Sequence, residues 1–432
     1  MKSSQKVFLL LVSILIAGNN SPLAHALDID LIGVGSISGT ATDNSGLLGN
    51  LEDGTPHNRL GGFGSALAYT GFGNRYVAAP DRGPSDGMTS YLDRYYTFDI
   101  TVGGGLVVPT LLETHLLTNG SGQNYTGNRD AFDATNSPES LRFDPEGIRV
   151  SSQKTLFISD EYGPFIHEFN KQGERIRTIP IPDKFGIANP SANPTAELSG
   201  NTSGRQANRG MEGLAISPDG KKLYGAMQSA LIQDGALNSS LARRGVNNRI
   251  LEIDLATGAT REFVFQLDDR SNGVNEIVAI NDHEFLVIER DGRVGSNAQT
   301  KKIFWIDING ATDVSGIAAL PQTGLPAGVT AVSKSLLIDM LDPAFNLAGA
   351  GFPEKIEALA FGPDLLDGRH LLLVLNDNDF MASVASNFYA FAIGTSVFPD
   401  FQAQVMIPEP SSFLMIGLAI GCAALARRKI AA

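Results

Sequence analysis

The stretch "FDPEGIRVSSQKTLFISDEYG", residues 143–163, contains two short apolar runs separated by a polar turn. Glu146 stands just before the first run, and Asp160 and Glu161 stand just after the second. The runs have the length and composition of β-strands, and the Ser, Gln and Lys residues between them indicate a turn. In an antiparallel hairpin, the start of the first strand and the end of the second lie at the same edge. The stretch therefore predicts a hairpin with three carboxylates at one edge.

The same plan recurs along the chain. An acid, an apolar strand, a turn and a second apolar strand align by eye in residues 145–163, 211–229, 275–292 and 356–379, and more faintly in 63–83, where Ser65 replaces the acid. Three of these units continue into a further hairpin. Four-stranded units repeated along an all-β chain indicate a β-propeller.

A sixth unit could be closed by joining "LDIDLIGVGSIS" (27–38) to the last strands around "FYAFAI" (388–393) and "FQAQVMI" (401–407). We therefore expect an all-β chain folded as a six-bladed β-propeller. A two-sheet sandwich is the alternative architecture. It explains the alternation of the strands but not the recurring acid.

In a propeller the first strand of each blade lines a central channel, so acids from several blades should meet at one mouth of it. Two unit charges about 4 Å apart repel by roughly 4 kcal/mol at an effective dielectric of 20, so protons or cations must be present. Oxygen donors without a thiol or a histidine pair favour Ca²⁺. The alternative is that the acids are solvated or cap strand ends. The expected metal-binding residues are Glu146, Asp160, Glu161, Glu212, Glu276, Glu289, Glu357, Asn376 and Asp377, with Asp379 as a further donor.

The two ends of the chain carry export signals. Lys2 and Lys6, the apolar run 7–18 and "AHA" before Leu27 form the pattern of a secretory signal peptide. A membrane anchor is the weaker alternative because about 20 apolar residues are needed to span a bilayer. At the other end, "PEP" (408–410), an apolar segment and the basic run 427–429 resemble the PEP-CTERM sorting signal of Gram-negative bacteria, which is cut by an exosortase; a plain anchor is the alternative.

We therefore expect a signal peptide in residues 1–26, a propeller body in 27–407 and a hydrophobic sorting helix in 408–432. Signal peptidase and exosortase are the expected processing partners. The protein should be exported across the inner membrane and end at the cell surface, in the envelope or outside the cell.

Composition excludes several functions for the body. The formal net charge is −13 and basic runs are absent from the body, which argues against nucleic acids and anionic membranes as partners. The single cysteine, Cys422, lies in the C-terminal segment, so disulfides, zinc–thiolate sites and cysteine nucleophiles are excluded. The G-x-S-x-G, HExxH and Walker patterns do not occur.

Four motifs resemble one family. "DPEGIR", "SDEYGPFIHEF", "NRGMEGLAISPDGKKLY" and "EALAFGPDLLDGRHLLLVLNDNDF" resemble the phytase-like family, also called "esterase-like activity of phytase", and the likeness covers about residues 60–395. The resemblance implies a six-bladed propeller distantly related to the calcium-dependent β-propeller phytases. Those enzymes hydrolyse phosphate monoesters with metal-bound water.

On that resemblance, Ca²⁺ would be held by the acids and a water would be activated for attack at phosphorus, with Glu146, Asp160, Glu161 and Glu212 as catalytic residues. Arg82, Arg209 and Arg290 are expected to bind phosphate oxygens, although each could instead pair with a neighbouring acid. Ser65 and Gln228 replace possible ligands, and the basic cluster that a highly phosphorylated inositol requires is absent, so a simpler phosphoester is the expected substrate.

Two alternatives from other classes stay open. One is a lactonase or carboxylesterase that opens its substrate with calcium-activated water. The other is a non-enzymatic surface protein, exported into exopolysaccharide, whose calcium only stiffens the channel.

Overall fold

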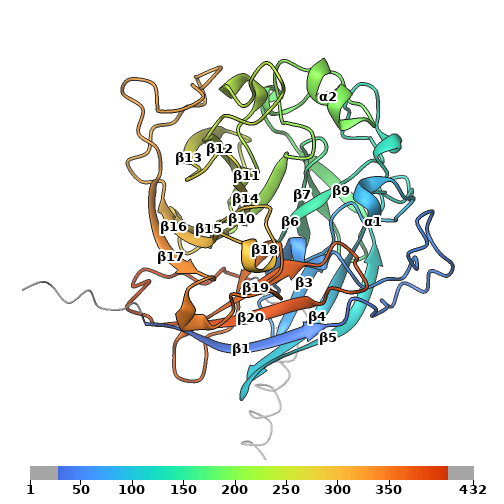
Figure 1. Ribbon diagram of the computed structural model, residues 1–432, viewed down its shortest axis with the longest axis vertical. Coiled ribbons are helices and arrows are strands. Elements are labelled where there is room, and N and C mark those ends of the chain that lie inside the picture. The colour runs from blue at the N-terminus through green and yellow to red at the C-terminus, as the bar shows by residue number, and fades with distance from the viewer. Residues whose placement is uncertain (1–27, 407–432) are drawn as a thin grey trace, which may run out of the picture.

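The computed structural model describes residues 28–406, and these residues form a ring of five four-stranded blades (Figure 1). Within this range no helix is long and apolar enough to cross a membrane. The signal peptide and the sorting helix expected from the sequence lie outside the described residues.

The strands follow one another blade by blade. They are β2 (Ala66–Tyr69), β3 (Arg75–Ala79), β4 (Arg94–Gly103) and β5 (Gly105–Leu116); β6 (Pro145–Val150), β7 (Leu156–Asp160), β8 (Ile166–Phe169) and β9 (Arg175–Ile179); β10 (Met211–Ile216), β11 (Lys222–Met227), β12 (Asn247–Asp254) and β13 (Thr260–Gln266); β14 (Gly273–Ala279), β15 (Glu284–Arg290), β16 (Lys301–Asp307) and β17 (Ser333–Asp339); β18 (Lys355–Phe361), β19 (His370–Asp377), β20 (Ser386–Ile393) and β1 (Ile29–Ile37).

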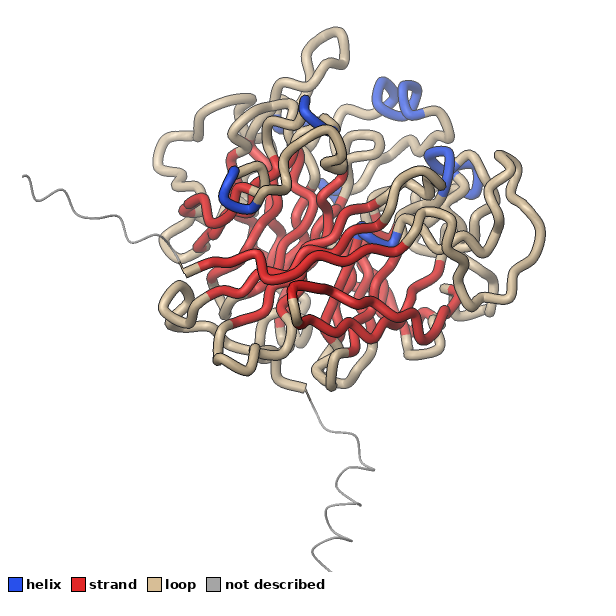
Figure 2. The backbone as a smooth tube through the Cα atoms, turned by 60° about the horizontal axis from the view of Figure 1, so that its bottom comes forward, coloured by secondary structure: helices blue, strands red, loops and turns tan. Residues whose placement is uncertain are grey.

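Helical segments are short and lie in the connections. They are α1 (Pro84–Gly87) and α2 (Pro194–Gly200), and the 3₁₀ turns η1 (Phe63–Ser65), η2 (Arg129–Ala131), η3 (Asp183–Phe185), η4 (Ile232–Asp234), η5 (Gly295–Asn297) and η6 (Pro343–Phe345). Figure 2 shows most of the helical segments and the longer loops on one side of the strands.

Each blade is an antiparallel meander, and the first strands of the blades form the closed inner ring. β2, β6, β10, β14 and β18 each contact the next first strand, and β18 contacts β2. Antiparallel pairing joins each first strand to the second, third and fourth in order. This arrangement confirms the all-β propeller class, and the sandwich alternative is excluded.

The blade count differs from the expected six. β1 pairs antiparallel with β20 from Ile29 opposite Ile393 to Ile37 opposite Ser386, so the N-terminal strand completes the blade of β18, β19 and β20. It does not begin a blade of its own, and residues 401–406 form no strand. A short parallel pairing of β1 with β5, from Gly33 opposite Gly105, then joins two blades into one eight-stranded sheet.

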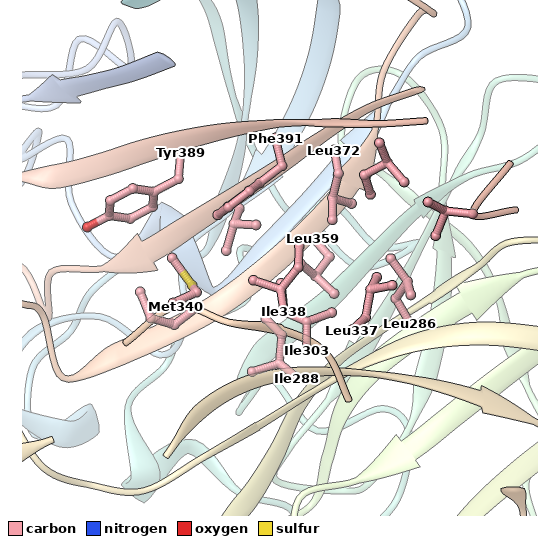
Figure 3. Packing of buried hydrophobic residues seen from close by; sticks show 14 of the residues in the cluster. Leu286, Ile288, Ile303, Leu337, Ile338, Met340, Leu359, Leu372, Tyr389 and Phe391 are labelled. Carbon is pink, nitrogen blue, oxygen red and sulfur yellow. The ribbon is translucent and has the colours of Figure 1, made fainter. Parts of the chain in front are cut away.

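The hydrophobic core lies between neighbouring blades. Figure 3 shows one such layer, in which Leu286 and Ile303 of the fourth blade pack near Leu359, Leu372 and Phe391 of the fifth. Because each blade is covered on both faces, its middle strands are nearly continuous apolar runs. Each such fully buried side chain stabilises the fold by about 1.5–3 kcal/mol.

A buried ion pair joins three inner strands inside the ring. The guanidinium of Arg149 on β6 donates to the carbonyl oxygens of Leu67 (2.9 Å) and Ile277 (2.7 Å) and lies 2.9 Å from Glu276 Oε2. The cavity that Arg149 lines and the cavity that the acids line have no lining residue in common, so the channel has two separate mouths.

One mouth is crossed by residues 401–406, which we call the C-terminal strap. The backbone N–H groups of Gln402 and Val405 donate to the carbonyl oxygens of Ile280 (2.9 Å) and Pro218 (2.8 Å). Beside them, the Gln404 amide donates to the carbonyl of Val150, the last residue of β6. The acids expected to form the site lie at the opposite end of the same strands.

Candidate functional site

A β-bulge in the pairing of four inner strands supplies the first set of cavity side chains. The register with the second strand shifts between Pro145 and Ile148, Met211 and Gly213, Val274 and Glu276, and Ile356 and Ala358. A bulge leaves a residue out of the ladder and re-aims its side chain. The side chains released in this way, all lining one cavity, are Glu146, Glu212, Asn275 and Glu357.

The bulge moves one expected residue out of this set. The repeat aligned by eye placed Glu276 beside the other acids, whereas Asn275 occupies the equivalent position. Glu276, one residue further, accepts hydrogen bonds from the backbone N–H groups of Leu214 (3.1 Å) and Ile277 (2.8 Å) and pairs with Arg149. Burial raises the pKa of Glu276 to about 7, although Arg149 acts in the other direction. Glu276 thus closes the channel and does not line the cavity.

The second strands supply another set. The residues opposite the first residue of each bulge are Asp160, Met227, Glu289 and Asn376. In each second strand, the next residue therefore takes an equivalent place at the mouth. These next residues are Glu161, Gln228, Arg290 and Asp377. The geometry brings together the two ends of each hairpin, as the sequence predicted.

Asp160, Glu289 and Asn376 have other contacts and do not line the cavity. Asp160 accepts hydrogen bonds from three backbone N–H groups at 2.7–3.0 Å. Glu289 accepts a backbone N–H, a side-chain amide and the ammonium of Lys334 (2.6 Å). Asn376 hydrogen-bonds to backbone groups, including the N–H of Asn387 at 2.7 Å. Alternation along a strand explains this placement, because each residue is one step from the cavity side chain.

The strongest metal-binding geometry is a cluster of three buried acids. Asp144, Glu146 and Glu161 each offer one carboxylate oxygen within 4.8 Å of the other two. Burial, followed by repulsion from Glu212 and Asp144, raises the pKa of Glu146 well above its ordinary value. Burial and Asp144 also raise the pKa of Glu161, although Arg82 lowers it. The cluster is therefore short of positive charge.

Several oxygens at this mouth are buried without a hydrogen-bond partner. They are Glu161 Oε1, Glu212 Oε2 and Asn275 Oδ1. The other oxygen of Glu212 accepts bonds from Gln228 and Asn275, both at 2.7 Å. An unsatisfied buried polar atom costs about 1–3 kcal/mol. A hard cation that takes 6–8 oxygen ligands would satisfy these atoms, so the residues present fit Ca²⁺.

A second group of acids lies across the mouth. Asp81, Asp377 and Asp379 also bring one oxygen each within 4.8 Å of one another. The ammonium of Lys355 lies 3.0 Å from Asp377 Oδ2 and 3.7 Å from Asp81 Oδ2, and it donates to Asp379. Burial alone would lower the pKa of Lys355, but Asp377 and its neighbours raise it well above the ordinary value.

The three expected arginines all line the cavity, but they differ in their partners. Arg82 lies 2.6 Å from Asp144 and 3.2 Å from Glu161, so it pairs with the acid cluster. Arg290 pairs with Glu357. Among the described residues, the guanidinium of Arg209 donates only to the amide oxygen of a glutamine, Gln228 Oε1, at 2.8 Å.

A further arginine, not identified from the sequence, stands beside them. Arg243 lines the cavity and donates to the backbone carbonyl of Ser271 at 2.8 Å. Burial and the nearby Arg209 lower the pKa of Arg243 to about 10. Within residues 28–406, neither Arg209 nor Arg243 has a carboxylate partner. We call Arg209, Arg243 and Arg290 the arginine wall.

The cavity has a volume of about 440 Å³ and is lined mainly by charged and amide side chains. Glu146 and Glu161 of the acid cluster line this cavity together with the arginine wall. Ser65 is buried, and its hydroxyl donates to the carbonyl oxygen of Gly62 at 3.0 Å. The cavity is therefore suited to hold a cation and an anion together. None of the serines that line it is paired with a histidine.

Sequence reasoning missed Asp144, Asn275, Arg243 and Lys355. Asp144 lies in the quoted stretch itself, two residues before Glu146, and Lys355 begins β18. Asn275 was hidden because the bulge cannot be read from the letters "VNEI". Arg243 lies in the long insertion between β11 and β12, which has no strand pattern.

Two family models match the chain. Residues 58–380 match the family described as "Phytase-like: Esterase-like activity of phytase", and residues 407–429 match the PEP-CTERM protein-sorting motif. Both resemblances noted in the sequence are thereby confirmed. The sorting motif shows that the protein is exported to the cell envelope or surface.

One curated relative and several solved structures are similar to the chain. An uncharacterized secreted protein of Arthroderma benhamiae is 28% identical, over 81% of this chain and 86% of its own. A luciferin-regenerating enzyme matches with a TM-score of 0.34 and 11% identity, over 79% of this chain and 80% of its own. A gluconolactonase from Xanthomonas campestris matches with a TM-score of 0.33 and 9% identity, over 83% and 89%. At these TM-scores, the structural likenesses do not bear on function.

Proposed function

The chain belongs to the phytase-like family, and from this membership and the cavity we propose that it is a calcium-dependent hydrolase of phosphate esters. The protein is an exported propeller, and the esterase-like activity that its family description names belongs to the hydrolase class. The calcium ion, the phosphoester substrate and the roles of individual residues are our proposal. A single observation carries it: a buried acid cluster with unpartnered oxygens shares one cavity with arginines that lack carboxylate partners.

The acids of this chain provide the proposed ion site. Asp144, Glu146 and Glu161 would hold Ca²⁺, and Asn275 would contribute its unpartnered oxygen. When bound, the ion supplies positive charge at the acid cluster and lowers the pKa of a coordinated water. Asp160, Glu276, Glu289 and Asn376 are not part of this proposed site because their oxygens are already used elsewhere.

The arginine wall is the proposed site for the phosphate. Arg209 and Arg243 have donors that no carboxylate uses, and guanidinium groups bind phosphate oxygens in bidentate fashion. Arg290 shares its charge with Glu357 and would contribute less. Arg82 serves mainly to hold Asp144 and Glu161 in place.

The proton transfers are assigned to two glutamates. In hydrolysis, a water oxygen bonds to phosphorus while the bond to the leaving oxygen breaks. Glu146 would take the proton that the water loses. Glu212 would give a proton to the leaving oxygen, since burial and the repulsion from Glu161 raise the pKa of Glu212 well above its ordinary value.

The experiment compares three substrates with the purified protein. Initial rates are measured with p-nitrophenyl phosphate, a p-nitrophenyl carboxyl ester and a lactone, each with calcium and with a chelator. We expect phosphate hydrolysis that requires calcium. Glu161→Gln should lower kcat/KM by at least about 100-fold, because it removes a ligand from the ion site. Glu113→Gln, an exposed strand position, is the matched control.

Two outcomes would contradict the proposal. Turnover of the carboxyl ester or the lactone alone, unaffected by Arg243→Met, would assign the cavity to carboxyl ester chemistry. Stabilisation by calcium without turnover of any substrate would favour a non-enzymatic surface protein.

A further inference from the structure

Each acid group at the mouth contains one residue pair that occupies an equivalent place in its blade. In the second blade, the N–H of Glu161 donates to the carbonyl oxygen of Asp144 at 3.0 Å, so these residues lie opposite each other. In the fifth blade, Lys355 lies opposite Asp377 in the strand register. The fold therefore places a lysine in one blade where it places an aspartate in another.

Lys355 supplies a cation to the second group. Its ammonium has three N–H donors, and the three acids around it are Asp81, Asp377 and Asp379. The side chain of Lys355 is 19% exposed and that of Asp377 is fully buried, whereas that of Asp379 is 39% exposed, so the group opens to solvent at Asp379.

The two groups differ in how well their oxygens are satisfied. In the first group, Glu161 Oε1 is buried without a partner, as is Glu212 Oε2 beside it. Within residues 28–406, no buried oxygen of Asp81, Asp377 or Asp379 is without a partner. Arg82 bonds to both oxygens of Asp144, with its backbone N–H donating to Oδ1 at 2.8 Å and its guanidinium to Oδ2 at 2.6 Å, but it reaches only one oxygen of Glu161. Arg82 thus leaves a buried oxygen of the first group without a partner, whereas the second group, which contains Lys355, has none in the described residues.

We propose that the ammonium of Lys355 is the built-in cation of the Asp81, Asp377 and Asp379 group, so that the mouth takes a single divalent ion, at Asp144, Glu146 and Glu161. This inference rests on the proposed function for the position of that ion. A covalently attached ammonium cannot be removed by a chelator, so the second group keeps its charge balance when calcium is lost. Lys355 also lines the cavity and presents a fixed positive charge to an anionic substrate.

The stoichiometry of calcium binding tests this inference. Isothermal titration of calcium into the chelator-treated, full-length protein should give one ion per chain. Lys355→Met should give two, because three carboxylates within 4.8 Å then lack a cation. Lys355→Arg is the matched control and should keep one. Lys355→Met combined with Asp377→Asn should return the number to one.

Three results would overturn the inference: two ions in the unchanged protein, no gain of an ion in a folded Lys355→Met variant relative to the unchanged protein, or a lower stoichiometry in Asp377→Asn alone. If Lys355→Met does not fold, the calcium stoichiometry of the single variant Asp377→Asn tests the inference. One bound ion per chain in that variant supports it. Failure of the proposed function has a different signature. The unchanged protein would then bind no calcium, while Lys355→Met would bind one.

Discussion

At this mouth, two residues that are adjacent in a strand can have different roles. Asn275 faces the cavity, and the adjacent Glu276 is buried in the ion pair with Arg149. The sequence predicted that Glu146, Glu161, Glu212 and Glu357 would meet, and they do line one cavity. It could not predict which of two neighbouring residues a bulge selects, because a bulge depends on pairing with another strand and leaves no mark in composition. For the same reason Asp160 and Glu289 were expected in the cavity.

The ion pair between Arg149 and Glu276 yields the first prediction on stability. Arg149→Met should lower the free energy of unfolding by about 3–5 kcal/mol, because it leaves a buried carboxylate without its partner. Urea denaturation measures this change. Arg177→Met, which breaks a half-exposed pair with Glu168, is the control and should cost at most about 1 kcal/mol. Equal effects of the two substitutions would show that the central pair has no special role.

At the scale of elements, the repeat predicted the hairpins and the closing of the ring better than it predicted the number of blades. The N-terminal strand was expected beside the last strands, and β1 does pair with β20. The sixth blade was wrong because these strands complete a unit that already had two strands. The spacing of the repeated units along the chain cannot distinguish strands that form a new blade from strands that complete a blade already begun. The register of β1 against β20 shows that the N-terminal strand completes the fifth blade.

The contact between β1 and β5 gives a prediction for this closure. A Cβ atom added at Gly35 would lie 1.9 Å from the carbonyl oxygen of Val107, so the backbone of β1 would have to move away from β5. Gly35→Ala should therefore lower the free energy of unfolding by about 1–3 kcal/mol. Gly103→Ala, at a strand glycine with open space around it, is the control. Urea unfolding of the two variants compares them, and equal midpoints would mean that this contact does not hold the ring closed.

At the scale of the whole molecule, the folded protein buries many of its carboxyl groups. Burial raises the pKa values of Asp81, Asp160 and Glu276 to about 7 each. In the unfolded chain these groups have their ordinary pKa values near 4. The folded protein therefore binds more protons than the unfolded protein between about pH 4 and pH 7.

A pH dependence of stability follows from these values. In the presence of a chelator, the free energy of unfolding should decrease as the pH rises from about 4 to about 7. Thermal melting at a series of pH values measures this change. Glu276→Gln should make the slope shallower because one of the groups no longer titrates. A stability that rises with pH across this range would contradict the assigned direction.

The C-terminal strap lies on the side of the ring away from the acids. It fastens the end of the described chain to the mouth opposite the acids, and the sorting motif begins at the next residue, 407. None of residues 401–406 lines the cavity, so the segment that leads to the sorting motif leaves the acid-lined mouth uncovered. Under the proposed function, a substrate would enter this mouth without displacing the strap.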